Sequence, residues 1–439
     1  MEKTPEEKAA VLNDLGVLQR NRNEYMQAEA SYQEALTIHR ELASVNPQIY
    51  LPEVAATLNN LGNLQSRRNE YAQAEASYQE ALTIYRDLAD VNPPTYLPDV
   101  AMTLHNLGFL QRDINEYEKA EDSYQKALTI YRVFVAVNPQ TYRPYVAGTL
   151  NDLGILQRRR NENAQAETSF QEALTIRREL AAVNPQAYRP DVAATLTNLG
   201  ILQSDRNENT QAEASYQEAL TIRRELASVN PQTYLSDVAN TLDNLGILQS
   251  DRNEYEKAEA SYQEALTIRR ELASVNPQTY LPDVAHTLNH LENLQSDKKE
   301  YEQAEASYQE VLKIYREFAA ANPQTYLPDV ASTLNNLCVL QSERNEYEQA
   351  EASYQEVLKI YRGFAAVNPQ IYLPNVVMTL ANLAVFYIQA VPNKQLSISY
   401  AEEVLSYGAA LEHIPTAFPS IATALAVLEC WETATMRLK

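Results

Sequence analysis

An Asn-Pro dipeptide recurs eight times in this chain, and each copy lies 46 residues after the previous one. The copies begin at Asn46, Asn92, Asn138, Asn184, Asn230, Asn276, Asn322 and Asn368. Self-similarity at a constant period of roughly 20–50 residues is typical of stacked repeats, so the spacing predicts a repeat array. A single core usually splits in a chain of 439 residues, whereas an array can grow because each repeat contacts only its neighbours.

Each repeat contains two apolar patterns with helical spacing. In the second repeat, Leu58, Leu61 and Leu64 recur on one side of the first pattern, and Gly62 lies beside them. The second pattern consists of Ala74, Tyr78, Ala81 and Leu82. Residues spaced three and four apart share one face of a helix. We therefore expect two helices, at about 52–67 and 70–91, that pack closely through their small residues.

The ends of these helices also carry signals. Pro52 suits the first position of a helix, where its missing N–H costs nothing. Asn92 is expected to take the left-handed conformation that ends a helix, and Pro93 then prevents the helix from continuing. The sequence thus predicts a sharp turn at every Asn-Pro.

The order of small and aromatic residues resembles the tetratricopeptide repeat. Gly62, Ala74, Tyr78 and Ala81 fall on the positions that define this family. The long repeat, with its Thr-Leu-Asn-Asn-Leu start, is most similar to the kinesin light chain variety, and the resemblance covers residues 11–410. It implies an all-α fold, a right-handed α-solenoid superhelix of about nine helical hairpins.

The pattern weakens at both ends of the chain. We expect the solenoid to cover residues 1–414, with a degenerate ninth hairpin at 369–414. Residues 415–439 predict a C-terminal capping helix over the last apolar face, because four large residues recur there at helical spacing. These are Ile421, Leu425, Leu428 and Trp431. The opening carries charges typical of a polar end cap, namely Glu2, Lys3, Glu6, Glu7 and Lys8.

Composition limits the partners and the compartment. The net charge of −22 argues against nucleic acid and against anionic membranes, which both need basic surface. No run approaches the length of a membrane span, and no apolar leader is evident at the start. The two cysteines, Cys338 and Cys430, form no metal or redox motif. We expect a cytoplasmic protein without a cofactor.

The family resemblance implies where a ligand would bind. In tetratricopeptide proteins the first helices line a concave surface, and the inward positions are −6, −3, −2, +1, +4 and +5 from the repeat Gly. The candidate groove residues at these positions are Asn60, Asn63, His105, Asn106, Phe109, Ile155, Asn198, Ile201, Asn244, Ile247, Asn293 and Asn336. Such a groove would hold a peptide segment or a protein surface.

Two rows within this set have alternative interpretations. Position −2 is Asn in most repeats, and a row of carboxamides can pair with both the N–H and the C=O groups of an extended peptide. The same asparagines can instead bridge neighbouring helices. The apolar row of Phe109, Ile155, Ile201 and Ile247 either receives side chains of a partner or packs laterally between adjacent helices.

Repeats four and five are richer in arginine than the rest of the chain. The candidate basic patch consists of Arg143, Arg158, Arg159, Arg177 and Arg189. Its functional interpretation is a local site for an acidic segment. The alternative is neutral drift on a solvated helix face, because local charge excesses are common.

The sequence contains little evidence for a catalytic or metal site. His286 and His290 lie one helical turn apart and form half of a metal site, but no third ligand is evident and no HExxH motif is present. Glu292 replaces the repeat Gly in the same repeat, and a charged side chain there must either open the hairpin or reach solvent. We expect no metal and no enzymatic activity.

The sequence therefore favours a non-catalytic scaffold that binds a protein or peptide in its groove. The alternative is a sensor or regulatory arm of a signalling or defence system whose effector lies elsewhere. We expect a monomer, and the exposed ends of a repeat array leave end-to-end association open.

Overall fold

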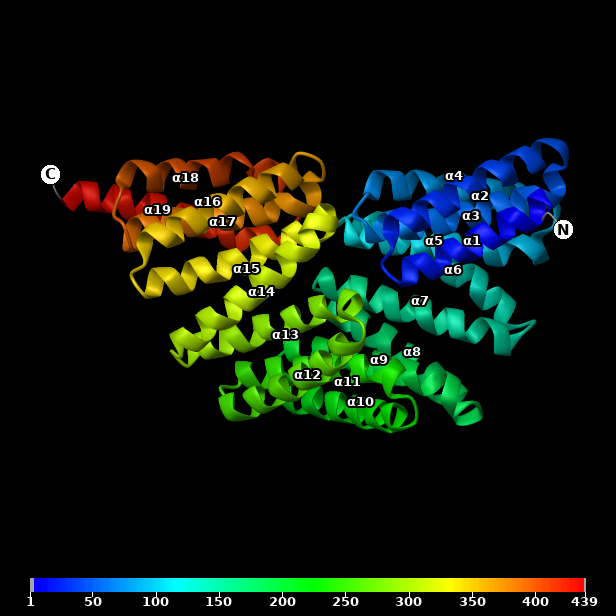
Figure 1. Ribbon diagram of the computed structural model, residues 1–439, viewed down its shortest axis with the longest axis horizontal. Coiled ribbons are helices and arrows are strands. Elements are labelled where there is room, and N and C mark those ends of the chain that lie inside the picture. Colours follow the sequence, from blue (N-terminus) through cyan, green and yellow to red (C-terminus); the bar gives the residue numbers. More distant parts are fainter. Residues whose placement is uncertain (1–3, 438–439) are drawn as a thin grey trace. The chain divides into compact units, whose positions relative to one another are not determined.

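The computed structural model describes residues 4–437. Glu2 and Lys3, the first charges of the expected end cap, and residues 438–439 lie outside the described residues. The described chain is helical and contains no strand. It folds as an all-α solenoid of helical hairpins, which confirms the fold class that the 46-residue spacing predicts (Figure 1).

Each repeat contributes one first helix and one second helix. The first helices are α1 (Pro5–Asn21), α3 (Pro47–Arg67), α5 (Pro93–Asp113), α7 (Pro139–Arg159), α9 (Pro185–Asp205), α11 (Pro231–Asp251), α13 (Pro277–Asp297), α15 (Pro323–Glu343) and α17 (Pro369–Gln389). The second helices are α2 (Tyr25–Val45), α4 (Tyr71–Val91), α6 (Tyr117–Val135), α8 (Asn163–Val183), α10 (Asn209–Val229), α12 (Tyr255–Val275), α14 (Tyr301–Ala321), α16 (Tyr347–Ala365) and α18 (Lys394–Ser406). Two short 3₁₀ turns, η1 (Gly408–Ala410) and η2 (Pro415–Ala417), lead to α19 (Phe418–Arg437).

The helices form two compact units. The first comprises Met1–Leu248 with Glu271–Tyr280, and the second comprises Gln249–Arg270 with Leu281–Lys439. In the first unit α1 packs against α2 and α2 against α3, and neighbouring first helices such as α1 and α3 also touch. In the second unit α14 to α18 pack in the same serial way. Each repeat therefore buries its apolar faces against the repeats on either side.

The first helices begin earlier than the sequence predicts. α3 begins at Pro47, directly after Asn46, and Pro52 lies inside the helix rather than at its start. Asn92 is extended, with φ −138° and ψ 77°, so the expected left-handed conformation is wrong. The reason is steric, because a proline disfavours the helical conformation in the residue before it and fits the first turn of a new helix. One extended residue therefore joins most consecutive repeats, whereas three residues join α6 to α7 and α16 to α17.

The left-handed residues lie instead in the turn within each hairpin. They have φ between 58° and 64° and are Asn23, Asn69, Asn115, Asn161, Asn207, Asn253, Lys299 and Asn345. Asn tolerates this conformation better than most residues. The Tyr71 hydroxyl donates to Asn69 Oδ1 at 2.6 Å and supports the turn. Asn163 and Asn209 replace this tyrosine in repeats four and five.

The repeat Gly makes room for an aromatic ring. A Cβ at Gly62 would lie 2.7 Å from Cε1 of Tyr78, which is 2% exposed. Glu292 occupies the same position in repeat seven and is fully buried, so it does not reach solvent. Both its carboxylate oxygens lack a hydrogen-bond partner among the described residues. Burial raises the pKa of Glu292 to about 10.

The C-terminal helix α19 packs on α17 and α18. Trp431 Nε1 donates to Ser397 Oγ at 2.9 Å, and that hydroxyl donates to the carbonyl of Ala384 at 2.8 Å. Leu425 does not belong to the covering face, because it is 51% exposed. The small residue Ala424 is buried in its place.

One described helix, α17, is long and apolar enough to cross a membrane by length and composition. This finding differs from the prediction that no run of the sequence approaches the length of a membrane span. Its residues Val376, Val377, Leu380 and Leu383 are completely buried, and the helix packs against α16 and α18. Such burial is also typical of a core helix in a repeat array.

Candidate ligand-binding face

The candidate groove positions lie on one side of the first helices, which we call the first-helix face. It comprises the six positions counted from the repeat Gly, and it is described separately in each unit. In the first unit Phe109 of α5 is 41% exposed, and in the second unit Val339 of α15 is 44% exposed at the same repeat position. The face is therefore open to solvent where these residues lie.

The asparagines at position −2 contact the preceding first helix. Asn60 Nδ2 donates to Asn13 Oδ1 at 3.1 Å, and Asn198 Nδ2 donates to Asn151 Oδ1 at 3.0 Å. Asn382 makes the same bond, at 3.4 Å, in the second unit. For these three residues the geometry is the one expected of a helix bridge. Asn106, Asn244 and Asn336 are half-buried at the equivalent positions.

Two other candidate asparagines support core tyrosines. Asn63 Oδ1 accepts a hydrogen bond of 2.8 Å from the Tyr78 hydroxyl. Asn293 Oδ1 accepts one of 3.0 Å from Tyr308. Sequence reasoning missed this role, although the tyrosine always lies fifteen residues after the asparagine in these two repeats.

The apolar row combines exposed and packed residues. Arg112 places its guanidinium carbon 4.2 Å from the centre of the exposed Phe109 ring. Ile155 and Ile201 are half-buried and pack against core clusters of the first unit, and Ile247 is also half-buried. Phe109 is therefore the residue of this row that is most available to a partner.

A charged cluster lies next to Phe109 and joins α5 to α7. His105 Nε2 lies 3.1 Å from Asp152 Oδ2, and Arg112 Nη1 lies 3.8 Å from Asp152 Oδ1. Burial opposes ionisation of Asp152, but the hydrogen bond and the positive charges outweigh it and hold its pKa below the usual value. His105 Nδ1 also lies 3.1 Å from the hydroxyl of Thr149.

This cluster is not a nucleophile activated by a histidine. The Thr149 hydroxyl is buried and donates its own proton to the carbonyl of Tyr145 at 2.8 Å. The hydroxyl proton of Thr149 is therefore directed at that carbonyl and not at His105 Nδ1, so the hydroxyl is not activated as a nucleophile in this arrangement.

A hollow of about 400 Å³ opens on the first-helix face between α15 and α17. Tyr347, Tyr354 and Phe386 contribute aromatic walls, and Val339 and Glu343 lie at repeat positions +1 and +5. The remaining lining residues are Ser342, Asn382, Val385, Gln389 and Ala390. The candidate groove residues predicted from the sequence do not line this hollow. The sequence signals for it are Phe386, which replaces the leucine of the other repeats, and Ala390, which replaces a residue that is basic in most of them.

The structure does not bring the five candidate arginines together. Arg177 is buried and donates to the carbonyl of Asp191 at 3.1 Å and to Thr195. Arg143 and Arg189, near the starts of α7 and α9, pair with Glu179 and Glu225. At the other end of α7, Arg158 pairs with Asp205 at 2.6 Å and Arg159 with Asp113 at 3.5 Å. Each guanidinium is thus already bound to acidic or carbonyl oxygens.

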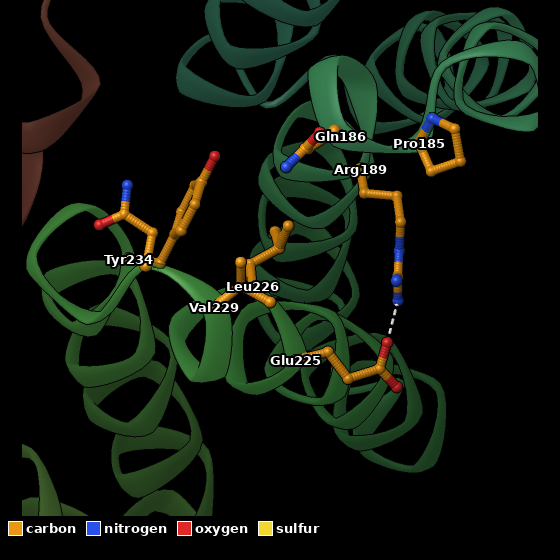
Figure 2. Close-up of a pocket in the computed structure, with 8 residues that line it drawn as sticks. Pro185, Gln186, Arg189, Glu225, Leu226, Val229 and Tyr234 are labelled. Atoms are coloured by element: carbon orange, nitrogen blue, oxygen red, sulfur yellow. Dashed lines mark hydrogen bonds and ion pairs between the residues drawn. The ribbon is translucent and has the colours of Figure 1, made fainter.

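Figure 2 shows one of these pairs, in which Arg189 of α9 reaches Glu225 of α10. The pair flanks a hollow of about 280 Å³ that Leu226, Val229 and Tyr234 also line. Arg189, like Arg143, occupies a position that is leucine in most other repeats. An ion pair between half-exposed side chains contributes about 0–1 kcal/mol.

The two candidate metal ligands contact each other and a tyrosine. The rings of His286 and His290 meet edge to face with centroids 4.7 Å apart, and His290 stacks on Tyr262 at 5.6 Å. Burial raises the pKa of nearby Asp329 to about 6, although His286 acts in the opposite direction. No group of three metal-binding side chains occurs among the described residues.

Two family models match this chain. One family model, described as tetratricopeptide repeat, matches residues 7–87. A second with the same description matches residues 100–133, 146–184, 192–231, 238–278 and 330–362. The chain belongs to the tetratricopeptide repeat family. Proteins of this family are generally non-catalytic scaffolds for protein interactions, and the matches indicate the same coarse role here.

Several solved structures are similar to this chain. BtubC (BKLC) from P. vanneervenii is 25% identical with a TM-score of 0.45, over 56% of this chain and 92% of that protein. The apo form of RapI is 14% identical with a TM-score of 0.48, over 97% and 98%. A STAND protein with a tetratricopeptide repeat sensor from Pyrococcus horikoshii is 16% identical with a TM-score of 0.48, over 83% and 49%. No curated protein matches the chain.

Proposed function

We propose that this chain binds a segment of a partner protein on its first-helix face. In this proposal an apolar side chain of the partner occupies the hollow between α15 and α17. The observation that carries the proposal is the coincidence of that hollow with the family's ligand positions, since Val339, Ser342, Glu343, Asn382 and Val385 all occupy them.

The chemistry of the hollow suggests which segment fits. Its volume of about 400 Å³ suits one large side chain, and aromatic walls favour burial of an apolar or aromatic group. Glu343 places a carboxylate beside the apolar walls, and the chain has a net charge of −22. A partner segment with a large apolar residue next to Lys or Arg satisfies both features.

The first unit supplies a second contact of the same kind. Phe109 is exposed beside the His105–Asp152–Arg112 cluster. A ring held over a guanidinium is a rigid apolar anchor of the kind that often dominates binding. We assign Phe109 to the ligand-binding face of that unit and expect it to contribute independently of the hollow.

Selection of a phage-displayed library of random dodecapeptides on the whole chain tests the proposal. We expect enriched peptides to carry an apolar residue beside Lys or Arg. Val339→Glu should weaken their binding about tenfold, because it places a charge in an apolar site. Val367→Glu is the matched control, since Val367 is 74% exposed at a connector.

Three results are informative. Loss of binding in Val339→Glu alone supports the hollow, and loss in Phe109→Glu alone moves the ligand to the first unit. Equal binding by all variants, with unchanged circular dichroism, overturns the proposal.

A further inference from the structure

The first helix of the chain exposes a face that every other first helix buries. Val11, Leu15 and Leu18 of α1 are 45%, 39% and 48% exposed. The residues equivalent to Leu15 and Leu18 in the next repeat, Leu61 and Leu64, are 3% and 0% exposed. In the later repeats these positions are packed against the preceding repeat, so the face of α1 has the shape and chemistry of a stacking surface.

The last helix exposes a matching face. Phe418 and Leu425 of α19 are 48% and 51% exposed, and Ala422 and Glu429 are exposed between and beyond them. Their spacing along the helix is four, three and four residues. Val11, Leu15 and Leu18 of α1 and the exposed Arg22, which directly follows the last residue of that helix, have the same spacing. Both faces therefore form a narrow apolar seam that ends in one charged residue, basic at one end and acidic at the other.

We propose that the chain associates head to tail, with α1 of one copy packed parallel to α19 of the next copy. In register, Val11 faces Phe418, Leu15 faces the small Ala422, and Leu18 faces Leu425. Large residues thus alternate with a small one, and Arg22 meets Glu429. The interaction goes beyond the proposed ligand binding, because it uses the ends of the array and leaves the first-helix face free.

The parallel arrangement follows the pattern inside the chain. α19 packs on α18, the second helix that precedes it, and also on the first helix α17. Consecutive first helices such as α1 and α3 run in the same direction and touch. An α1 helix placed beside α19 would therefore repeat a contact that the array already makes.

A symmetric pairing of two α1 helices is less favourable. An antiparallel seam centred near Leu15 would bring the two Asp14 residues together at the two-fold axis. Like charges placed opposite one another weaken a helix pair. The parallel pairing with α19 instead matches opposite charges, Arg22 with Glu429. It uses two different surfaces, so each added copy leaves one face free for the next.

Analytical ultracentrifugation of the whole chain over a concentration series tests this inference. We expect the wild-type average mass to rise beyond that of a dimer. Leu18→Glu removes the head surface, and Leu425→Glu removes the tail surface, so each variant alone should remain a monomer. An equimolar mixture should form dimers that grow no further, because the Leu18→Glu copy keeps its tail and the Leu425→Glu copy keeps its head.

The mixture separates head-to-tail association from its alternatives. Pairing through α1 alone would leave Leu425→Glu dimeric by itself and would give no mixed dimer. A wild-type chain that remains monomeric at every concentration overturns the inference. All these residues are exposed, so circular dichroism should show intact helices in both variants.

The charged pair provides a second, independent test. Arg22→Glu and Glu429→Arg should each weaken self-association about tenfold, and the double variant should regain most of the loss. Equal self-association by all three charge variants would remove the proposed register.

Discussion

Repeats four to six and repeats seven and eight use different chemistry in the same hairpin. In repeat five Arg223 of α10 is buried and donates to the carbonyl of Asp237 at 3.2 Å and to Thr241 of the next repeat. In repeat eight the equivalent Tyr361 donates to the carbonyl of Pro328 at 3.4 Å, within its own repeat. The guanidinium therefore links neighbouring repeats, whereas the phenol links the two helices of one hairpin.

Either an arginine or a tyrosine can therefore occupy this position of the second helix. Arg177, Arg223 and Arg269 all bond to a threonine of the following first helix. Burial lowers the pKa of Arg223, because the charged form loses solvent, and the Asp237 carboxylate only partly offsets this effect. A buried guanidinium thus combines a desolvation cost with strong hydrogen bonds. The tyrosine repeats avoid that cost by filling the space with an aromatic ring.

Glu292 in repeat seven should give the largest change in stability. Burial favours the neutral carboxyl and raises its pKa in the folded state. The free energy of unfolding is therefore highest below the unfolded pKa and falls as the pH rises toward about 10. We expect Glu292 to cost the wild type up to about 1.4 kcal/mol per pH unit between pH 6.5 and 8, above the pKa of Asp329. Glu292→Gly, which restores the residue of other repeats, should remove this contribution to the slope. Urea unfolding followed by Trp431 fluorescence measures it.

The control for this prediction is a second carboxyl of the same unit. Glu343→Gly removes an exposed carboxyl from the same unit and should leave the pH slope as it is. If Glu292→Gly has the same slope as the wild type, the buried carboxyl does not control the stability of the second unit.

Arg223 should give the next largest effect. Arg223→Ala should destabilise the first unit by about 2–3 kcal/mol, because Thr241 and the Asp237 carbonyl lose a charged donor and a cavity remains. Arg223→Tyr imports the residue of the other repeats and should recover most of the loss. Thermal unfolding compares both with Arg224→Ala, the neighbouring exposed arginine. If Arg223→Ala and Arg224→Ala lower the stability equally, the buried arginine does not link neighbouring repeats as proposed.

The turn within the hairpin should give the smallest effect. Repeats four and five lack the tyrosine that supports the left-handed asparagine, whereas Tyr347 donates to Asn345 in repeat eight. Asn209→Tyr should restore this bond and stabilise the turn by about 0.5–1 kcal/mol. Hydrogen exchange of the Asn207 region measures the change. Slower exchange is expected, and faster exchange would mean that the ring does not fit the turn.

Local sequence patterns predicted most of the secondary structure of this protein. The 46-residue spacing and the leucines at helical positions predicted the hairpins and their order. Gly62 and Ala74 were predicted to let the two helices pack closely, but the contact of Gly62 with the Tyr78 ring became visible only in the structure. Such predictions succeed because helix formation and face-to-face packing depend mostly on residues three, four and seven apart. The predicted start of the helix was wrong for the same local reason. Pro47 and Pro52 both suit a first turn, and only Pro47 begins the helix.

The site required the tertiary structure. Asn60 could either bind a ligand or bridge helices, and only its bond to Asn13 of another repeat shows what it contacts. The basic residues looked like one patch along the chain, yet each pairs with a residue brought near by folding. The hollow between α15 and α17 arises where Tyr354 and Phe386 meet across two repeats. A periodic sequence determines the unit and its order, whereas contacts between copies depend on side chains about 46 residues apart, and only packing decides which of them meet.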